Sequence, residues 1–324
     1  MQTDRREQCE EKKTIASPSR SEVRLQPPHR GLESALLTEE RQPVVSPSMP
    51  QSSLASSLEV GLQPSALQWD AELLPHSASP AATKRIMALC CDDRNVYVVR
   101  ADSKDIDIYS AGEWTRSIAV PSAGWLSGIA VSAVHNCLYA GANQSTQLHR
   151  VGLASASHTV WYVPKWPAGL SISPAEEIMC CCVDKAVIAV LCPLTGNRVF
   201  TMALYEVGIR KPWHAVWLPS GMVAVTAADP SHKVWLLSRD CRKHGSYSQL
   251  NNPRCLLPLT ASQNSVLACD RDNNRAVAVD FSARQSRVLA MDIAQPAGIA
   301  VDIASRSLFI GEWGEQKRVL TYQF

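Results

Sequence analysis

The chain has 324 residues, of which 46% are hydrophobic and 19% are charged, and its formal net charge is +2 at pH 7. A charge this close to zero argues against a strongly polyanionic partner. The first residues lack the apolar core of a signal peptide, and the longest apolar runs, such as residues 186–192, are too short to cross a bilayer. We therefore expect a cytoplasmic protein with no membrane contact, in which the 11 cysteines stay reduced.

Residues 1–64 are rich in Ser, Pro, Gln and Glu and show neither helical nor alternating periodicity. Such a segment buries too little apolar surface to offset the entropy lost on ordering, so we predict a disordered tail. The first 80 residues hold 8 Lys+Arg and 11 Asp+Glu, which leaves 24 and 19 for the remainder and makes it mildly basic. This excess is scattered, and it does not by itself predict tight nucleic-acid binding.

Six related segments, which begin RIMAL, SGIAV, AGLSI, WHAVW, CLLPL and AGIAV, recur along the rest of the chain. When they are aligned on their second residue, the successive copies lie 41 to 45 residues apart, at Ile86, Gly128, Gly169, His214, Leu256 and Gly298. Short apolar runs alternate with turn residues, and the fifth repeat supplies four such runs, at residues 256–259, 266–269, 276–280 and 288–292. A period in the low forties with four strands predicts an all-β, six-bladed β-propeller of four-stranded antiparallel blades over residues 84–324.

The sixth repeat reaches Phe324 after its third strand, so the outer strand of that blade must come from elsewhere. We expect residues 65–83 to supply a closing strand and a linker, because an open ring would leave an exposed sheet edge. The strand itself is predicted at residues 66–74, with Trp69, Leu73 and Leu74 as apolar anchors. The alternative is that this stretch is a short apolar run within the disordered tail.

Two phrases of the repeat point to a known family. Residues 295–302 read QPAGIAVD and residues 270–275 read DRDNNR. Together with KWPAGLSIS, KPWHAVWLPSG and NNRAVAVD, they resemble NHL repeats, especially those of divergent invertebrate NHL-type proteins. The resemblance covers residues 84–324 and implies a six-bladed propeller that binds a protein or an RNA. No paired Cys/His spacing of a RING or B-box precedes the repeats, so the chain does not resemble a complete tripartite-motif ubiquitin ligase.

One face of the propeller is predicted to carry the binding residues. Strands of a meander alternate in direction, so the loop before the first strand and the loop between the second and third strands emerge on the same face. These loops interleave tryptophan with arginine and lysine, a combination that suits recognition of a peptide or of single-stranded RNA. The candidate binding residues are Trp125, Lys165, Trp166, Arg210, Lys211, Trp213, His214, Arg254, Arg271, Asn273 and Trp313. The same loops also bring Asn143, Gln144, Asp184, Lys185, His232, Asp272 and Asn274 to this face.

Structural roles compete with binding for several of these residues. Trp166 and Trp213 adjoin prolines and have the size to fill the wedge between blades. Four residues, Asp270, Asn273, Asn274 and Arg275, have the spacing to cap the turn between the second and third strands, with Arg275 bonded to Asp270 or to nearby carbonyl oxygens. For His214, we expect a position at the rim of the channel and a hydrogen bond to the backbone.

An enzyme with a metal in the central channel would need several converging ligands from the inner strands. In our alignment only His214 among the six inner positions has a ligand side chain, and Cys180 to Cys182 lie in one strand, where adjacent side chains face opposite sides. We therefore expect no catalytic residue, metal or cofactor. The leading hypothesis is a non-enzymatic protein-interaction scaffold, most simply a monomeric propeller. An RNA-binding propeller acting in post-transcriptional regulation ranks second, and a channel metal hydrolase or lyase third.

Overall fold

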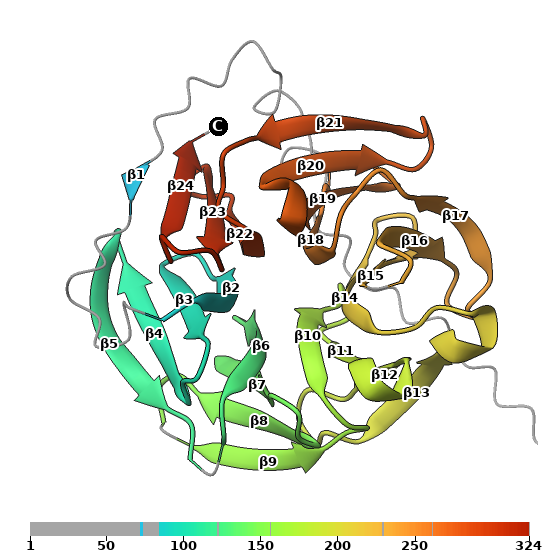
Figure 1. Ribbon diagram of the computed structural model, residues 1–324. Helices are drawn as coiled ribbons and strands as arrows, with labels where there is room; N and C mark the ends of the chain where they lie inside the picture. Colours follow the sequence, from blue (N-terminus) through green and yellow to red (C-terminus); the bar gives the residue numbers. More distant parts are fainter. Residues whose placement is uncertain are drawn as a thin grey trace, which may run out of the picture. The chain divides into compact units, whose positions relative to one another are not determined.

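The computed structural model describes residues 72–73, 84–121, 123–155, 157–228, 230–260 and 262–323. In these ranges the chain forms six four-stranded antiparallel sheets, which Figure 1 shows arranged as blades around a central axis. The predicted all-β, six-bladed propeller is thus confirmed. The predicted disordered tail of residues 1–64 lies outside the described residues, and its boundary stays a prediction.

Each blade runs from an inner strand at the channel to an outer strand at the rim. The strands of the first three blades are β2 (Ile86–Cys91), β3 (Asn95–Arg100), β4 (Asp105–Ser110) and β5 (Glu113–Ala119); β6 (Leu126–Ser132), β7 (Cys137–Ala142), β8 (Gln147–Gly152) and β9 (His158–Tyr162); and β10 (Pro167–Ile172), β11 (Ile178–Cys182), β12 (Val187–Leu191) and β13 (Arg198–Ala203). The strands of the next two are β14 (Pro212–Trp217), β15 (Val223–Ala227), β16 (Lys233–Leu237) and β17 (Lys243–Tyr247); and β18 (Pro253–Pro258), β19 (Ser265–Asp270), β20 (Arg275–Asp280) and β21 (Gln285–Ala290).

The sixth blade contains β22 (Pro296–Asp302), β23 (Ser307–Glu312) and β24 (Val319–Gln323), and its fourth strand is β1 (Glu72–Leu73). Strand β1 pairs antiparallel with β24, with Glu72 opposite Thr321 and Leu73 opposite Leu320. This pairing lies within residues 66–74, where the closing strand was predicted. The anchoring roles predicted for the side chains of Trp69, Leu73 and Leu74 fall outside the described residues.

Three short 3-10 helices complete the described structure, η1 (Val183–Lys185), η2 (Leu204–Val207) and η3 (Arg271–Asn273). Helices η1 and η3 connect the second and third strands of their blades. In four blades the residue directly before the proline that starts the inner strand has a positive φ, in the left-handed region of backbone conformation. These residues are Trp166, Lys211, Asn252 and Gln295. Repetition of this conformation gives the four loops the same path toward the channel.

The strand registers correct the alignment of two repeats. In every blade the inner strand shifts register after its first pair, as between Pro296 and Gly298 in β22. The equivalents of Gly298 are therefore Ala88 in β2 and Cys255 in β18, rather than Ile86 and Leu256 as predicted. Apolar patterning does not reveal an extra residue in a strand, so the alignment of these two divergent repeats was wrong by two residues and by one.

The inner glycines reflect how closely the inner strands approach one another. A Cβ atom on Gly128 would lie 2.2 Å from the carbonyl oxygen of Ala168, and one on Gly169 would lie 2.2 Å from that of Trp213. Real Cβ atoms do not come this close to a backbone oxygen. The recurrent glycine of the repeat is thus a packing requirement at the junction between neighbouring inner strands.

Six hydrophobic clusters form the core, and each lies between two neighbouring blades. Between the second and third blades, for example, Tyr139 and Leu148 are in one cluster with Leu170 and Ala189. Between the first and sixth blades, Arg100 is fully buried, pairs with Asp107 at 2.9 Å and donates to the carbonyl oxygen of Lys317 at 3.5 Å. Burial between blades and this long-range hydrogen bond hold the ring closed.

Candidate functional site

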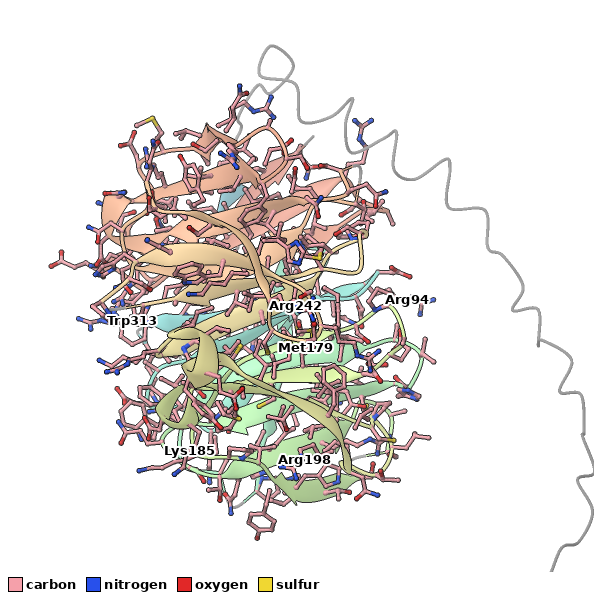
Figure 2. The ribbon with its side chains drawn as sticks, turned by 90° about the vertical axis from the view of Figure 1, so that its right-hand side faces the viewer. Arg94, Met179, Lys185, Arg198, Arg242 and Trp313 are labelled. Atoms are coloured by element: carbon pink, nitrogen blue, oxygen red, sulfur yellow. The ribbon has the colours of Figure 1, made fainter. Side chains whose placement is uncertain are left out.

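The loops that lead into the inner strands and the loops between second and third strands share one face, as predicted. We call it the start face, because the inner strands begin there. Figure 2 shows the propeller from the side, with Trp313 and Lys185 toward its left-hand face and Arg94 toward the opposite one. Lys185 and Trp313 follow second strands, whereas Arg94 lies in a turn between a first and a second strand. The two kinds of loop therefore separate onto opposite faces.

A cavity of about 180 Å³ opens on the start face above the channel. Its wall combines four tryptophans with two arginines, and we call it the tryptophan–arginine pocket. It is lined by Met87, Trp125, Asn143, Gln144, Trp166, Trp213, Arg254, Arg271, Ala297 and Trp313. Six of the eleven candidate binding residues are among them, contributed by every blade except the first. The first blade supplies Met87, which sequence reasoning missed.

The aromatic rings of the pocket contact one another and the arginines. Trp166 and Trp213 meet edge to face, with ring centroids 5.7 Å apart and an interplanar angle of 79°. The guanidinium carbon of Arg254 lies 3.7 Å from the ring centroid of Trp213. Those of Arg271 and Arg85 lie 5.2 Å and 5.4 Å from the ring centroid of Trp313. These cation–π contacts hold positive charge against the aromatic wall.

Several polar atoms of the pocket residues are buried without a hydrogen-bond partner among the described residues. They are Nε and Nη1 of Arg254, Nε of Arg271, the indole Nε1 of Trp166 and the amide Oδ1 of Asn143. Burial, and then the charge of Arg271, lower the pKa of Arg254 to about 9. Burial also lowers the pKa of Arg271, whose Nε lies 4.0 Å from the carboxylate of Asp272. Arg254 therefore remains charged at neutral pH and has no ion-pair partner among the described residues, whereas Arg271 has only the exposed Asp272.

Five candidate binding residues lie outside this pocket, and one of them, His214, lines the central channel. Lys165 pairs with Asp184 at 3.6 Å, and both are exposed. Arg210 and Lys211 are exposed in the loop before β14. Asn273 donates its side-chain amide to Asp270 at 2.9 Å. These four residues share the face but not the cavity.

The predicted capping role of Asp270 and its neighbours is confirmed. Asp270 is fully buried and accepts from Nε of Arg275 at 2.6 Å and from the N–H of Asn251 at 2.6 Å. Arg275 also donates to the carbonyl oxygen of Gln249 at 3.2 Å. The carboxylate thus ties the turn of η3 to the loop that leads into β18.

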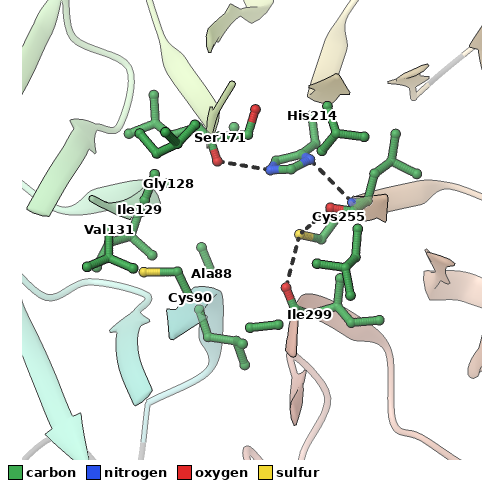
Figure 3. Close-up of a pocket in the computed structure, with 18 of the residues that line it drawn as sticks. Ala88, Cys90, Gly128, Ile129, Val131, Ser171, His214, Cys255 and Ile299 are labelled. Atoms are coloured by element: carbon green, nitrogen blue, oxygen red, sulfur yellow. Dashed lines mark hydrogen bonds between the residues drawn. The ribbon is translucent and has the colours of Figure 1, made fainter. Parts of the chain in front are cut away.

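The central channel beneath the pocket has a volume of about 280 Å³ and is lined by residues of all six inner strands. Figure 3 shows its wall, in which His214 and Cys255 lie on adjacent strands. His214 bonds through Nε2 to the carbonyl oxygen of Leu170 at 3.1 Å, and its Nδ1 accepts from the N–H of Leu256 at 3.3 Å. The predicted channel histidine bonded to the backbone is therefore confirmed, and it links three blades.

His214 and Cys255 also influence each other's ionisation. Burial opposes a charge on either group, but their mutual attraction raises the pKa of His214 and lowers that of Cys255. The hydrogen bonds favour the neutral pair, because Nδ1 of His214 acts as an acceptor and so carries no proton, and because the Cys255 thiol lies within 3.9 Å of the carbonyl oxygen of Ile299. Sequence reasoning missed Cys255 because the repeat was aligned one residue too late.

Metal-binding clusters are not found in the described residues, where no group of three or more His, Cys, Asp or Glu side chains is arranged to hold an ion. The three consecutive cysteines, Cys180 to Cys182, are fully buried and free. Their side chains enter two different interblade clusters, as the alternation of a strand requires. Nor does any helix in the described ranges have the length and apolar character needed to cross a membrane.

Comparisons with known proteins identify the fold. No protein-family model and no curated protein sequence matches the chain. Among solved structures, a catalytically inactive virginiamycin B lyase from Staphylococcus aureus with quinupristin matches with 11% identity and a TM-score of 0.59, over 76% of this chain and 83% of that one. A nidogen/laminin complex matches with 16% identity and a TM-score of 0.58, over 69% and 87%. The WD40 propeller domain of Doa1 matches with 14% identity and a TM-score of 0.56, over 79% and 97%. At these identities the similarity is one of fold, and the propeller fold serves enzymes and interaction scaffolds alike.

Proposed function

We propose that this chain is a non-enzymatic, NHL-type propeller that binds a partner polypeptide at the tryptophan–arginine pocket of the start face. The observation that carries the proposal is the position of two guanidinium groups in a cavity walled by four tryptophans: that of Arg254, which is buried without an ion-pair partner among the described residues, and that of Arg271, whose carboxylate neighbour among these residues is the exposed Asp272 at 4.0 Å. Tryptophan and arginine dominate the energetically important positions of protein interfaces, where they fill desolvated pockets near the centre. The pocket presents this combination at the centre of a face.

The chemistry of the lining residues supports binding rather than catalysis. The pocket contains Trp, Arg, Asn, Gln, Met and Ala side chains, and its described lining includes no His, Cys, Ser, Asp, Glu or Lys. General acid–base and nucleophilic catalysis use the absent residue types, such as His, Cys, Ser, Asp, Glu and Lys. The same fold serves a lyase among the compared structures, so the proposal rests on these residues and not on the fold.

The arrangement of the rings favours a polypeptide over RNA. Single-stranded RNA is held mainly by stacking of bases on free aromatic faces. In the pocket, guanidinium groups of Arg254 and Arg271 already lie against Trp213 and Trp313. Crosslinking with and without ribonuclease distinguishes binding of RNA from binding of a polypeptide.

A cytoplasmic location completes the proposal. All ten cysteines in the described part of the chain are free, although three of them lie consecutively in β11. Free thiols in this number are typical of a reducing compartment. The location can be checked by imaging the tagged full-length chain.

Site-specific photocrosslinking tests the proposed function. Trp125 is 43% exposed at the pocket, and Tyr162 is 74% exposed in the outer strand β9, so each tolerates replacement by p-benzoylphenylalanine. We expect a crosslink from position 125 to a polypeptide in cells, preserved after ribonuclease treatment and absent from position 162. Crosslinks that disappear with ribonuclease, or that are identical at both positions, would refute the proposal.

A further inference from the structure

The charge of the tryptophan–arginine pocket restricts its ligand. Arg254 and Arg271 line the pocket, and the guanidinium carbon of Arg85 lies 5.4 Å from the ring centroid of Trp313. The described lining contains no acidic side chain, and Asp272, the nearest carboxylate to Arg271, is 4.0 Å away and exposed. Desolvated guanidinium groups are stabilised by an anion, and a cation would be repelled.

The unpartnered atoms of the pocket define a more specific complement. Four of them are donors, namely Nε and Nη1 of Arg254, Nε of Arg271 and Nε1 of Trp166. A carboxylate only accepts hydrogen bonds, so it suits a pocket whose unpartnered side-chain atoms are mostly donors. The fifth atom, Oδ1 of Asn143, is an acceptor and would be satisfied by an N–H group. A carboxylate with an amide N–H close by has both features.

The size and floor of the pocket describe the rest of the ligand. A volume of about 180 Å³ leaves room for one amino-acid side chain inside the pocket. Met87 and Ala297 lie both in the pocket and in the channel wall, so they form an apolar floor between the two. An apolar or aromatic side chain next to the carboxylate would bury this floor and the tryptophan edges.

We propose that the tryptophan–arginine pocket binds a single carboxylate of a partner polypeptide, presented beside an apolar or aromatic side chain and an amide N–H. This inference rests on the proposed function and names the group that the pocket recognises. Arg254 and Arg271 donate to the carboxylate oxygens, and Asn143 accepts from the peptide N–H. The carboxylate comes from the C-terminus of the partner or from a Glu or Asp side chain, and both sources present the same chemistry.

Binding of small probes to the full-length chain tests the ligand class. The probes are N-acetylphenylalanine for a C-terminal carboxylate, N-acetyl-Phe-Glu-amide for a side-chain carboxylate, and N-acetylphenylalanine amide as the neutral control. Phenyl phosphate, phenyltrimethylammonium and an oligouridylate complete the set. The readout is the indole N–H signals in NMR spectra, assigned by substitution of Trp166 and Trp213. We expect one or both carboxylates to shift these signals saturably at millimolar concentration and the neutral amide to leave them unchanged.

Variants establish which groups bind. Arg254→Gln and Arg271→Gln should each weaken carboxylate binding at least about tenfold, because each removes charge-assisted hydrogen bonds. Arg198→Gln is the matched control, since Arg198 is exposed in the outer strand β13 and does not line the pocket. Unchanged amide spectra outside the pocket show that each variant is folded. Asn143→Asp should also weaken binding, because it adds a negative charge and changes little in size.

The outcomes separate this inference from the proposed function. Three results would overturn the carboxylate as the ligand class. The neutral amide could bind as tightly as the carboxylates, or phenyl phosphate, phenyltrimethylammonium or the oligouridylate could bind more tightly than they do. The third result is that neither carboxylate binds saturably. Crosslinks from position 125 to a polypeptide that persist in the Arg254→Gln and Arg271→Gln variants would uphold the proposed function and reject the carboxylate. Carboxylate binding without any polypeptide crosslink would uphold the ligand class and reject the protein-interaction function.

Discussion

The guanidinium of Arg254 stacks on the ring of Trp213 at 3.7 Å and forms no ion pair within the described residues. The two residues come from neighbouring inner strands, β18 and β14. Other buried or partly buried arginines, such as Arg100 and Arg318, have carboxylate partners in Asp107 and Glu312. The stack therefore holds a positive charge that no carboxylate of the described residues neutralises.

Arg254→Met should leave the free energy of unfolding unchanged or raise it by up to about 2 kcal/mol, because it removes a desolvated, unpaired charge and keeps apolar contact with Trp213. Arg318→Met is the matched comparison, since Arg318 donates to the fully buried Glu312 at 2.8 Å and 3.0 Å. It should lower the free energy of unfolding by about 3 kcal/mol. Urea unfolding of both variants checks this. Equal destabilisation would show that Arg254 is structural.

Much of the fold was predictable because its signal is repeated. A period of 41 to 45 residues, with short apolar runs and turns, specifies blade number and strand count together. The same repetition assigns loops to faces, so Trp125, Arg254 and Trp313 were placed on one face although nearly 190 residues separate the first from the last. Periodicity is a property of the whole chain, and it tolerates errors in single repeats.

What the sequence could not show depends on single residues. The register shift in each inner strand leaves no mark in an apolar pattern, so Cys255 was not recognised as the neighbour of His214 in the channel. Asn273 was placed on the correct face, but its amide turns into η3 toward Asp270 and not into the cavity. Loop assignment gives the position of a backbone segment, whereas the direction of a side chain depends on local hydrogen bonds.

The turn built around Asp270 should be essential to the fifth blade. Asp270→Asn removes the negative charge of the carboxylate to which Arg275 and the N–H of Asn251 donate hydrogen bonds, while it preserves the shape of the side chain. Because Asp270 is fully buried, we expect a loss of about 3 kcal/mol in the free energy of unfolding. Asp240→Asn is the control, since the ion pair of Asp240 with Arg242 is exposed, and it should leave the urea midpoint unchanged. A tolerated Asp270→Asn would contradict the capping role.

The inner glycines give a steric prediction. Gly169→Ala places a Cβ atom 2.2 Å from the carbonyl oxygen of Trp213, so β10 and β14 must separate. Overpacking of this kind should lower the free energy of unfolding by about 3 kcal/mol or prevent folding. Gly245→Ala in the outer strand β17 is the control, because a Cβ atom there would meet nothing within 4 Å. Thermal unfolding of the two variants checks the difference, and similar melting temperatures would show that the inner strands are not closely packed.

A buried histidine, His149, stacked on the half-buried His158 in the second blade, should make the propeller sensitive to mild acid. His149 is fully buried in β8, its Nδ1 lies 2.9 Å from Nε2 of His158 in β9, and the two rings stack with centroids 5.2 Å apart. Burial, and then the charge of His158, lower the pKa of His149 to about 4. In the unfolded chain this histidine titrates near 6.5.

The sign of the effect follows from these two pKa values. Between about pH 6.5 and pH 4 the unfolded chain binds a proton at His149 that the folded chain does not, so the free energy of unfolding decreases as the pH falls through this range. From about pH 7 to about pH 5 the expected loss is up to about 2 kcal/mol. His149→Phe should abolish most of this loss and keep the stacked ring, whereas His244→Phe, at an exposed position in β17, should not. Urea unfolding at the two pH values measures it, and an equal pH dependence in wild type and the His149→Phe variant would show that His149 does not control acid stability.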